Sequence, residues 1–201
     1  MMKYRKTFDE FEKIIVKDEL AKFLGVNDDG VIEFSYIDIV KSAGHSCGTV
    51  AGAYIIALEG LRALYKDELP KRGEIKVELK RAPREDNAGV VGSVLSNITG
   101  ASIDFGFGGL PTGAFNRRDT LFFEVEMQED VRLTRLDTNE SVSINYRPAK
   151  VVNPMAILMS AIAPDATQED KESFADRFQE MVQTLFNNKD KVIEILTPSK
   201  V

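Results

Sequence analysis

The sequence predicts an α+β fold: a mixed, largely antiparallel sheet, a central pair of glycine-rich helices and a C-terminal helical tail. Three observations lead to this prediction. Residues 50–65 are a long apolar segment with helical spacing. Short stretches typical of strands lie at 74–80 and between 121 and 146. A long amphipathic segment then begins after Asp165.

The composition is that of a soluble globular chain. Its 201 residues are 43% hydrophobic and 29% charged, enough for one ordinary domain. We expect a single domain over 1–201, with a core at about 31–147 and a helical extension at about 151–201. The net charge of −6, with Lys and Arg dispersed among acids, argues against a nucleic-acid partner.

The sequence also argues against a membrane or secretory location. The longest apolar run is far shorter than a membrane span, and no apolar stretch follows the basic N-terminus. A single cysteine excludes an intrachain disulfide and fits a reducing compartment. We therefore expect a cytoplasmic protein with no membrane partner.

The first predicted helix runs from Thr7 to Gly25. Thr7 and Glu10 have the spacing of a capping box, and the apolar residues that follow recur at helical intervals. Gly25 is typical of a helix end. After a turn of Asn, Asp and Gly residues, 31–36 suit a strand.

The central helix is predicted to follow the stretch 44–49, Gly-His-Ser-Cys-Gly-Thr. Gly44, Gly48 and Gly52 recur every fourth residue, so we expect them on one face of a helix. Each glycine lowers the stability of a helix by about 1 kcal/mol relative to alanine, so some other interaction of these glycines must offset the loss. The bare face either permits tight helix packing or admits a ligand or metal beside Cys47.

A second helix with a small-residue face is predicted over 85–100, ending at Gly100. Gly89, Gly92, Ser93 and Ser96 share its close-packing side in this prediction. We expect this helix to pack against the central one, because two faces without bulky side chains can approach closely.

The glycine-rich segment 101–118 has two interpretations. It lacks the spacing of a phosphate-binding P-loop or of a dinucleotide fingerprint. It is either a flexible crossover or a lid that clamps an anion. In the second case Gly106, Gly108 and Arg117 or Arg118 bind the carboxylate or phosphate of a small anionic molecule.

The last third of the chain is predicted to add strands and then helices. Three strands joined by hairpin turns are expected at 121–127, 131–136 and 141–146. A short apolar helix at 154–162 and a long one capped near 165–168 follow.

Two further expectations concern the apolar side chains of the short helix and the last residues of the chain. In the short helix, Met155, Leu158 and Met159 are expected to pack in the core or in a dimer rather than around a cofactor. Residues 192–196 are then expected to form a final strand.

His45 and Cys47 are the only histidine and the only cysteine, two positions apart where the central helix begins. Free backbone N–H groups and the positive end of the helix dipole favour negative charge there, hence a thiolate. Both residues are candidates for catalysis and for binding zinc or another transition metal. A catalytic dyad requires His45 to precede the helix, because residues two apart on a helix point to different faces.

Two ligands do not complete a metal site. The others would be water, residues of a second copy of the chain, or carboxylates, for which Glu85, Asp86 and Asp104 are candidates. The alternative is that Cys47 is a small buried hydrophobe and His45 a hydrogen-bonded helix cap.

These segments together resemble the FmdE family, named after one of the subunits of molybdenum formylmethanofuran dehydrogenase. Residues 44–47 and the small-residue helix after them are similar to the family's Gly-His-x-Cys-Pro-Gly motif. Residues 85–100 resemble its acidic helix that ends in Thr-Gly, and 106–110 its Gly-x-Gly-Asn-Leu loop. The resemblance covers about residues 35–125.

The chain departs from the family pattern in three places. Gly48-Thr49 replaces the Pro-Gly, the cysteines that the family has around its second helix are absent, and no C-terminal zinc ribbon of paired cysteines is present. The resemblance implies a metal or metal-containing cofactor bound through His45 and Cys47, in an open site. We expect the protein to be a homodimer, with Arg117 or Arg118 near a small anionic ligand. The alternative is a non-enzymatic binding or accessory module without a metal.

Overall fold

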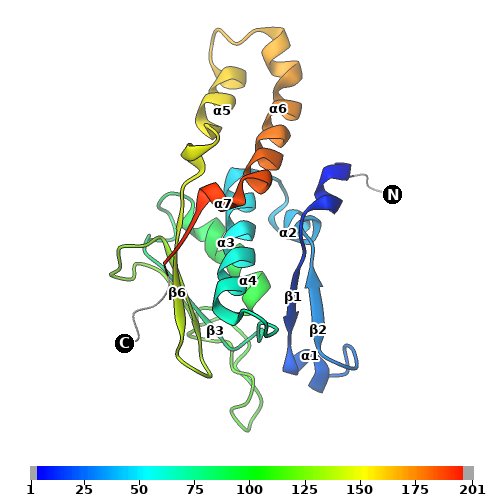
Figure 1. The fold of residues 1–201 in the computed structure, drawn as a ribbon, viewed down its shortest axis with the longest axis vertical. Coiled ribbons are helices and arrows are strands. Elements are labelled where there is room, and N and C mark those ends of the chain that lie inside the picture. The colour runs from blue at the N-terminus through cyan, green and yellow to red at the C-terminus, as the bar shows by residue number, and fades with distance from the viewer. Residues whose placement is uncertain (1–3, 197–201) are drawn as a thin grey trace.

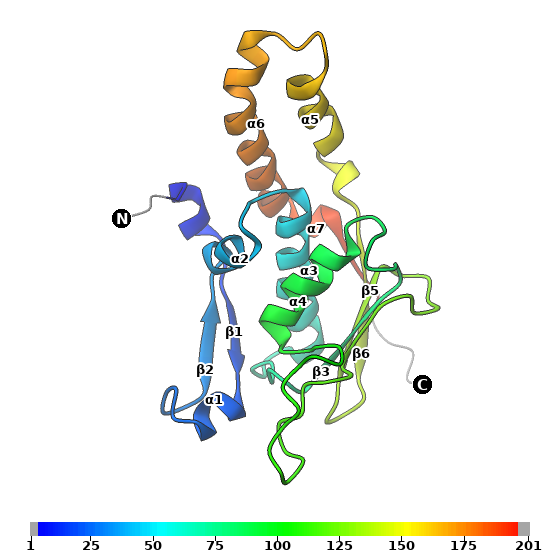
Figure 2. The same ribbon diagram turned by 180° about the vertical axis from the view of Figure 1, so that it is seen from behind.

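The main sheet has the strand order β4-β3-β5-β6-β7. The fold is described for residues 4–196 of a computed structural model, shown from two sides in Figures 1 and 2. The strands are β3 (Ile75–Leu79), β4 (Leu121–Phe122), β5 (Val131–Arg135), β6 (Ser141–Tyr146) and β7 (Ile193–Leu196). All neighbours are antiparallel except β3 and β4. This mixed sheet and the helices around it confirm the α+β prediction.

The strands after the glycine-rich segment pair differently from the prediction. The hairpin of β5 and β6 is confirmed, but β4 covers only the start of the expected strand 121–127 and pairs in parallel with β3. One edge of β3 is taken by β5, so β4 uses the other edge. Glu124 has a left-handed φ of 57°, which interrupts the extended backbone.

The N-terminal segment is not the predicted helix Thr7–Gly25. It forms a short 3-10 helix (Lys6–Glu10), then β1 (Ile14–Lys17) and α1 (Glu19–Phe23). The β-branched residues of β1 favour a strand, and Ile14 and Val16 point into the core while the strand pairs with β2 (Val31–Phe34). The strand predicted at 31–36 is thereby confirmed for residues 31–34, whereas Ser35 caps the next helix and Tyr36 begins it.

The expected three-glycine face does not exist. A separate helix, α2 (Tyr36–Ala43), ends at Gly44, which has a left-handed φ of 77°. The central helix α3 (Gly48–Tyr65) begins only after Cys47. Gly52 lies inside α3, where an added Cβ would collide with the ring of Tyr146. The small surface therefore receives a side chain from the sheet, not a second helix.

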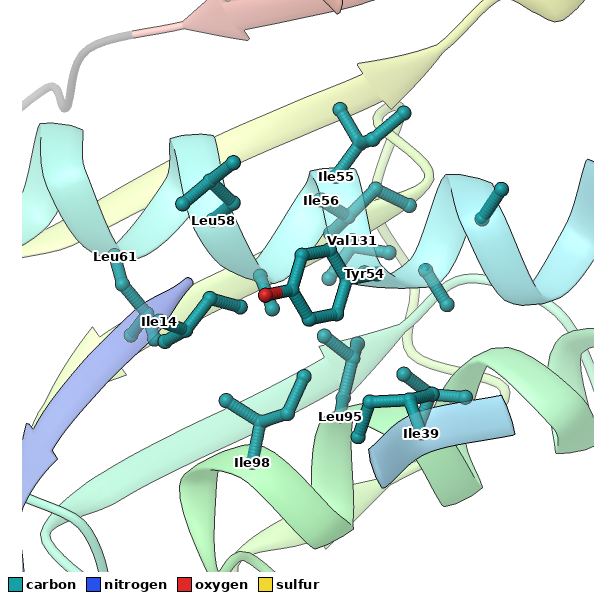
Figure 3. Close-up of a cluster of buried hydrophobic side chains, with 14 of the residues drawn as sticks. Ile14, Ile39, Tyr54, Ile55, Ile56, Leu58, Leu61, Leu95, Ile98 and Val131 are labelled. Carbon is teal, nitrogen blue, oxygen red and sulfur yellow. The ribbon is translucent and has the colours of Figure 1, made fainter. Parts of the chain in front are cut away.

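The second helix, α4 (Ala88–Thr99), ends at Gly100 as predicted and packs against α3 as expected. The contact uses large residues, however. Figure 3 shows Leu95 and Ile98 in one cluster with Tyr54 of α3 and Ile14 of β1. Gly92 instead faces another ring, because an added Cβ would lie 2.5 Å from Phe123 Cζ.

The C-terminal helices form an arm that projects from the body of the molecule (Figures 1 and 2). After a short 3-10 helix (Pro148–Lys150), the arm contains α5 (Pro154–Ile162) and α6 (Gln168–Asn187), and α7 (Lys189–Val192) leads back to β7. This confirms the predicted tail. Of the two alternatives for the α5 methionines, packing in the core is wrong, since Met155 is 63% and Met159 45% exposed. Packing in a dimer stays a prediction.

No helix within residues 4–196 is long and apolar enough to cross a membrane.

Candidate functional site

The loop between α2 and α3 holds the His-Ser-Cys stretch. Cys47 is the N-cap of α3, and its Sγ accepts a hydrogen bond from the Val50 N–H at 3.5 Å. Within residues 4–196, the N–H groups of Gly48 and Thr49 have no hydrogen-bond partner. The free donors and the positive end of the dipole thus meet beside the thiol.

Ser46 anchors this loop to the arm. Its hydroxyl is hydrogen-bonded to Gln179 Oε1 at 2.8 Å and to the Tyr36 hydroxyl at 2.9 Å. Gln179 Nε2 returns a hydrogen bond to the Ser46 carbonyl at 3.1 Å. Sequence reasoning missed Gln179, although an amide beside the apolar stripe of α6 is the signal that could have found it.

His45 and Cys47 do not converge. The imidazole is exposed, and its Nδ1 lies 3.0 Å from the Ala43 carbonyl oxygen. Cys47 is half-buried and lines a cavity whose walls do not include His45. No hydrogen bond joins the two side chains in the described part of the chain. The geometry therefore gives no support to a catalytic dyad.

The cavity beside Cys47, called here the α3 cavity, has a volume of about 560 Å³. It lies where five parts of the chain meet: the start of α3, the loop before α4, the first residue of β5, the last residue of β6 and the arm. Most of its wall is apolar and comes from Ile56, Leu79, Ala88, Val91, Val131, Leu158 and Phe178. Its size and apolar lining are those of a small-molecule site.

The charged residues of the cavity wall are paired. Arg147 Nη1 lies 2.5 Å from Asp130 Oδ2, and Arg81 Nε lies 3.3 Å from Asp86 Oδ2. The two pairs cancel in formal charge, so the start of α3 sets the local preference for an anion.

Tyr146 completes the cavity wall at the end of β6. Its hydroxyl donates to the Gly48 carbonyl at 3.1 Å. Burial, reinforced by the neighbouring Cys47, raises the pKa of Tyr146 well above its usual value. The phenol therefore stays protonated and remains a donor.

The predicted additional metal ligands do not gather at Cys47. Asp86 lines the α3 cavity, whereas Glu85 accepts a hydrogen bond from the Ala82 N–H at 3.2 Å. Asp104 lies in the loop after α4, outside the cavity wall. Residues 4–196 contain no group of three His, Cys, Asp or Glu that could hold a metal ion. His45 and Cys47 by themselves do not fit a zinc site, which takes at least three protein ligands.

The predicted anion clamp binds groups of the chain itself. Arg117 Nη2 lies 2.6 and 2.8 Å from the two carboxylate oxygens of Asp18, which is 2% exposed and also binds Arg72. Arg118 Nε donates to the Gly106 carbonyl at 2.7 Å.

Two further observations also indicate that the glycine-rich loop and Arg117 contact the chain itself and not a ligand in the α3 cavity. Gly108 forms an isolated β-bridge with Asn116, so the loop closes on itself. Arg117 also lines a smaller cavity of about 240 Å³. Neither arginine lines the α3 cavity.

No family model matches this chain, and no curated protein matches it. The resemblance to the FmdE family therefore stays a prediction from three short motifs.

Proposed function

We propose that this protein binds a small molecule, with an apolar body and an anionic group, in the α3 cavity. The observation that carries the proposal is the meeting of this cavity of about 560 Å³ with the start of α3. The N–H groups of Gly48 and Thr49 have no partner within residues 4–196 and can donate to an anion. The apolar wall would hold the rest of the molecule.

Two side chains add hydrogen-bond donors to the N–H groups at the start of α3. Arg147 uses Nη1 for Asp130 and the Tyr146 carbonyl, and its other two guanidinium nitrogens have no hydrogen-bond partner in the described residues. Thr49 adds a hydroxyl to the same wall. A carboxylate or phosphate would therefore find donors of two kinds, backbone N–H and guanidinium.

A transition metal bound through Cys47, in an FmdE-like protein, is the second candidate. The position of this thiol on the cavity wall favours it. The remaining ligands would come from water, from the bound molecule or from a second copy of the chain. We also propose a cytoplasmic location, because a lone cysteine suits a reducing compartment.

Octanoate and benzoate test the first proposal, with octanol and benzyl alcohol as uncharged counterparts. We expect the two anions to raise the melting temperature saturably and the alcohols to do so much less. Leu158→Trp, which fills the cavity, should abolish the effect, and Arg147→Gln should weaken it.

The matched control is Arg118→Gln, which removes an arginine outside the cavity and should leave binding unchanged. Binding that survives Leu158→Trp but is lost in Arg118→Gln would move the site to the glycine-rich loop. If neither anion raises the melting temperature, the proposal is wrong.

A further inference from the structure

The helix α5 forms part of the wall of the α3 cavity without a polar tie to any other element. Pro154, Met155 and Leu158 line the cavity. None of the nine residues of α5 is buried, and none is charged. In the described part of the chain, all hydrogen bonds of α5 lie within residues 153–163. Apolar contacts alone therefore hold α5 in place, and they are mainly with α6 (Figure 2).

The segments on either side of α5 are anchored to the body of the molecule. Before α5, the Arg147 N–H donates a hydrogen bond to the Val192 carbonyl at 2.7 Å. After it, Gln179 of α6 shares two hydrogen bonds with Ser46, and the second half of α6 carries the buried residues of that helix. Since α6 contains neither glycine nor proline, no residue in it favours a kink. Movement is thus confined to α5 and its two connections.

In its present position α5 covers the polar end of the α3 cavity. An added Cβ on Gly48 would lie 3.7 Å from Pro154 Cγ, so the first residue of α5 rests against the start of α3. The N–H groups of Gly48 and Thr49, which have no hydrogen-bond partner among the described residues, therefore lie beside α5. A ligand that reaches these donors must pass this helix. Lids over binding sites are usually weakly held parts of a fold, which α5 is.

We propose that α5 is a lid, which moves away from α3 to admit a ligand to the α3 cavity while the sheet, α3 and α6 stay folded. Opening separates half-exposed apolar side chains and breaks no hydrogen bond to another element. It therefore costs much less free energy than unfolding of the core. The lid rests on the proposed function only for the identity of what it admits, because its movement needs no ligand.

Cys47 makes the opening measurable, because it is the only thiol in the chain and lies on the cavity wall. N-phenylmaleimide, a rigid aromatic reagent, should react much more slowly with Cys47 of the folded protein than with the urea-unfolded protein. Ala156→Gly weakens α5 at an exposed position outside the cavity wall. Because glycine disfavours the helix relative to alanine, this variant should react roughly threefold to fivefold faster than the wild type.

The matched control is Ala175→Gly, the same change at an exposed position of the neighbouring α6. Urea unfolding should show similar losses of global stability in the two variants, but only Ala156→Gly should speed the reaction of Cys47. Equal acceleration in both variants, or none in Ala156→Gly, would overturn the lid. A wild-type thiol that reacts as fast as in the unfolded protein would overturn it too, because the cavity would then stand open.

Hydrogen exchange followed by mass spectrometry locates the movement. Backbone amides of residues 158–162 should exchange about tenfold faster or more than those of 181–186, at a rate that low urea concentrations leave unchanged. Exchange of both segments at the same rate would show that α5 does not open separately, and the lid would be wrong. Neither measurement uses a ligand. A failure of the lid is therefore distinguishable from a failure of anion binding, which the melting temperatures measure.

Discussion

The hydroxyl of Tyr146, at the end of β6, donates a hydrogen bond to the carbonyl of Gly48 at the start of α3, and its ring lies against Gly52. The contact ties the sheet to the first turns of the central helix. It also fixes one wall of the α3 cavity, because Tyr146 and Gly48 both line it. The absence of a side chain at Gly52 is what allows the ring to lie so close.

Gly52→Ala should therefore destabilise the fold. The new Cβ would collide with the Tyr146 ring, and overpacking of this kind costs about 1–3 kcal/mol. The control is Gly48→Ala, whose Cβ would have its nearest neighbours at 3.7–3.8 Å, in ordinary contact. Urea unfolding measures both. Equal stabilities of the two variants would contradict this account of the contact.

Arg117→Gln should reduce stability rather than ligand binding. The Arg117 side chain is 11% exposed and binds Asp18, whose side chain is 3% exposed. Because Arg72 still pairs with Asp18 in the variant, losing the Arg117 hydrogen bonds should cost about 1.5–3 kcal/mol. The control, Arg118→Gln, removes only an exposed hydrogen bond and should stay within about 0.5 kcal/mol of the wild type. An Arg117→Gln protein of unchanged stability that no longer binds anions would restore the clamp hypothesis.

The same ion pair predicts a loss of stability in acid. Burial opposes ionisation of Asp18, but hydrogen bonds from Arg117 and Arg72 outweigh it and hold the pKa of Asp18 below its usual value. Since the folded-state pKa is the lower one, the contribution is complete above the unfolded-state pKa of about 4 and is lost as the pH falls through the folded value.

Asp18→Asn provides the comparison for this pH dependence. The variant should be less stable at neutral pH and should lose less stability than the wild type between about pH 5 and pH 2. Urea unfolding across this range measures both curves. Parallel curves would show that Asp18 does not contribute to the acid sensitivity.

Metal content decides the second candidate function. We expect less than one metal ion per chain in protein purified without chelator, because the described residues bring fewer than three ligands to Cys47. Elemental analysis of the wild type, Cys47→Ser and His45→Ala checks this. Stoichiometric zinc or another transition metal that is lost in Cys47→Ser would establish a metal at this site.

Local patterns predicted several elements well. Gly100 ends α4 because it adopts a φ of 77°, which glycine accepts at no steric cost. The helical spacing of the apolar residues predicted where α3 runs, and the short turn between β5 and β6 indicated that these two strands pair antiparallel. Each of these features depends on residues close together in the chain.

The wrong predictions involve segments that are far apart. The phenylalanines and isoleucines near the N-terminus have helical spacing, but β1 forms because β2 offers a strand partner and the core accepts Ile14 and Val16. Likewise, β4 lies beside β3 because β5 already occupies the other edge. Pairings of this kind are settled by packing and not by periodicity.

The sequence by itself determined where the only thiol would meet a helix start, since one cysteine precedes one long apolar segment. Only the tertiary structure decided what surrounds it. Packing turned Cys47 to a cavity and left His45 in solvent, and it gave Arg117 a buried partner 99 residues away in the chain. The physical reason is that caps and turns are short-range, whereas the direction of a side chain and the partner of a charge depend on which distant segments pack beside them.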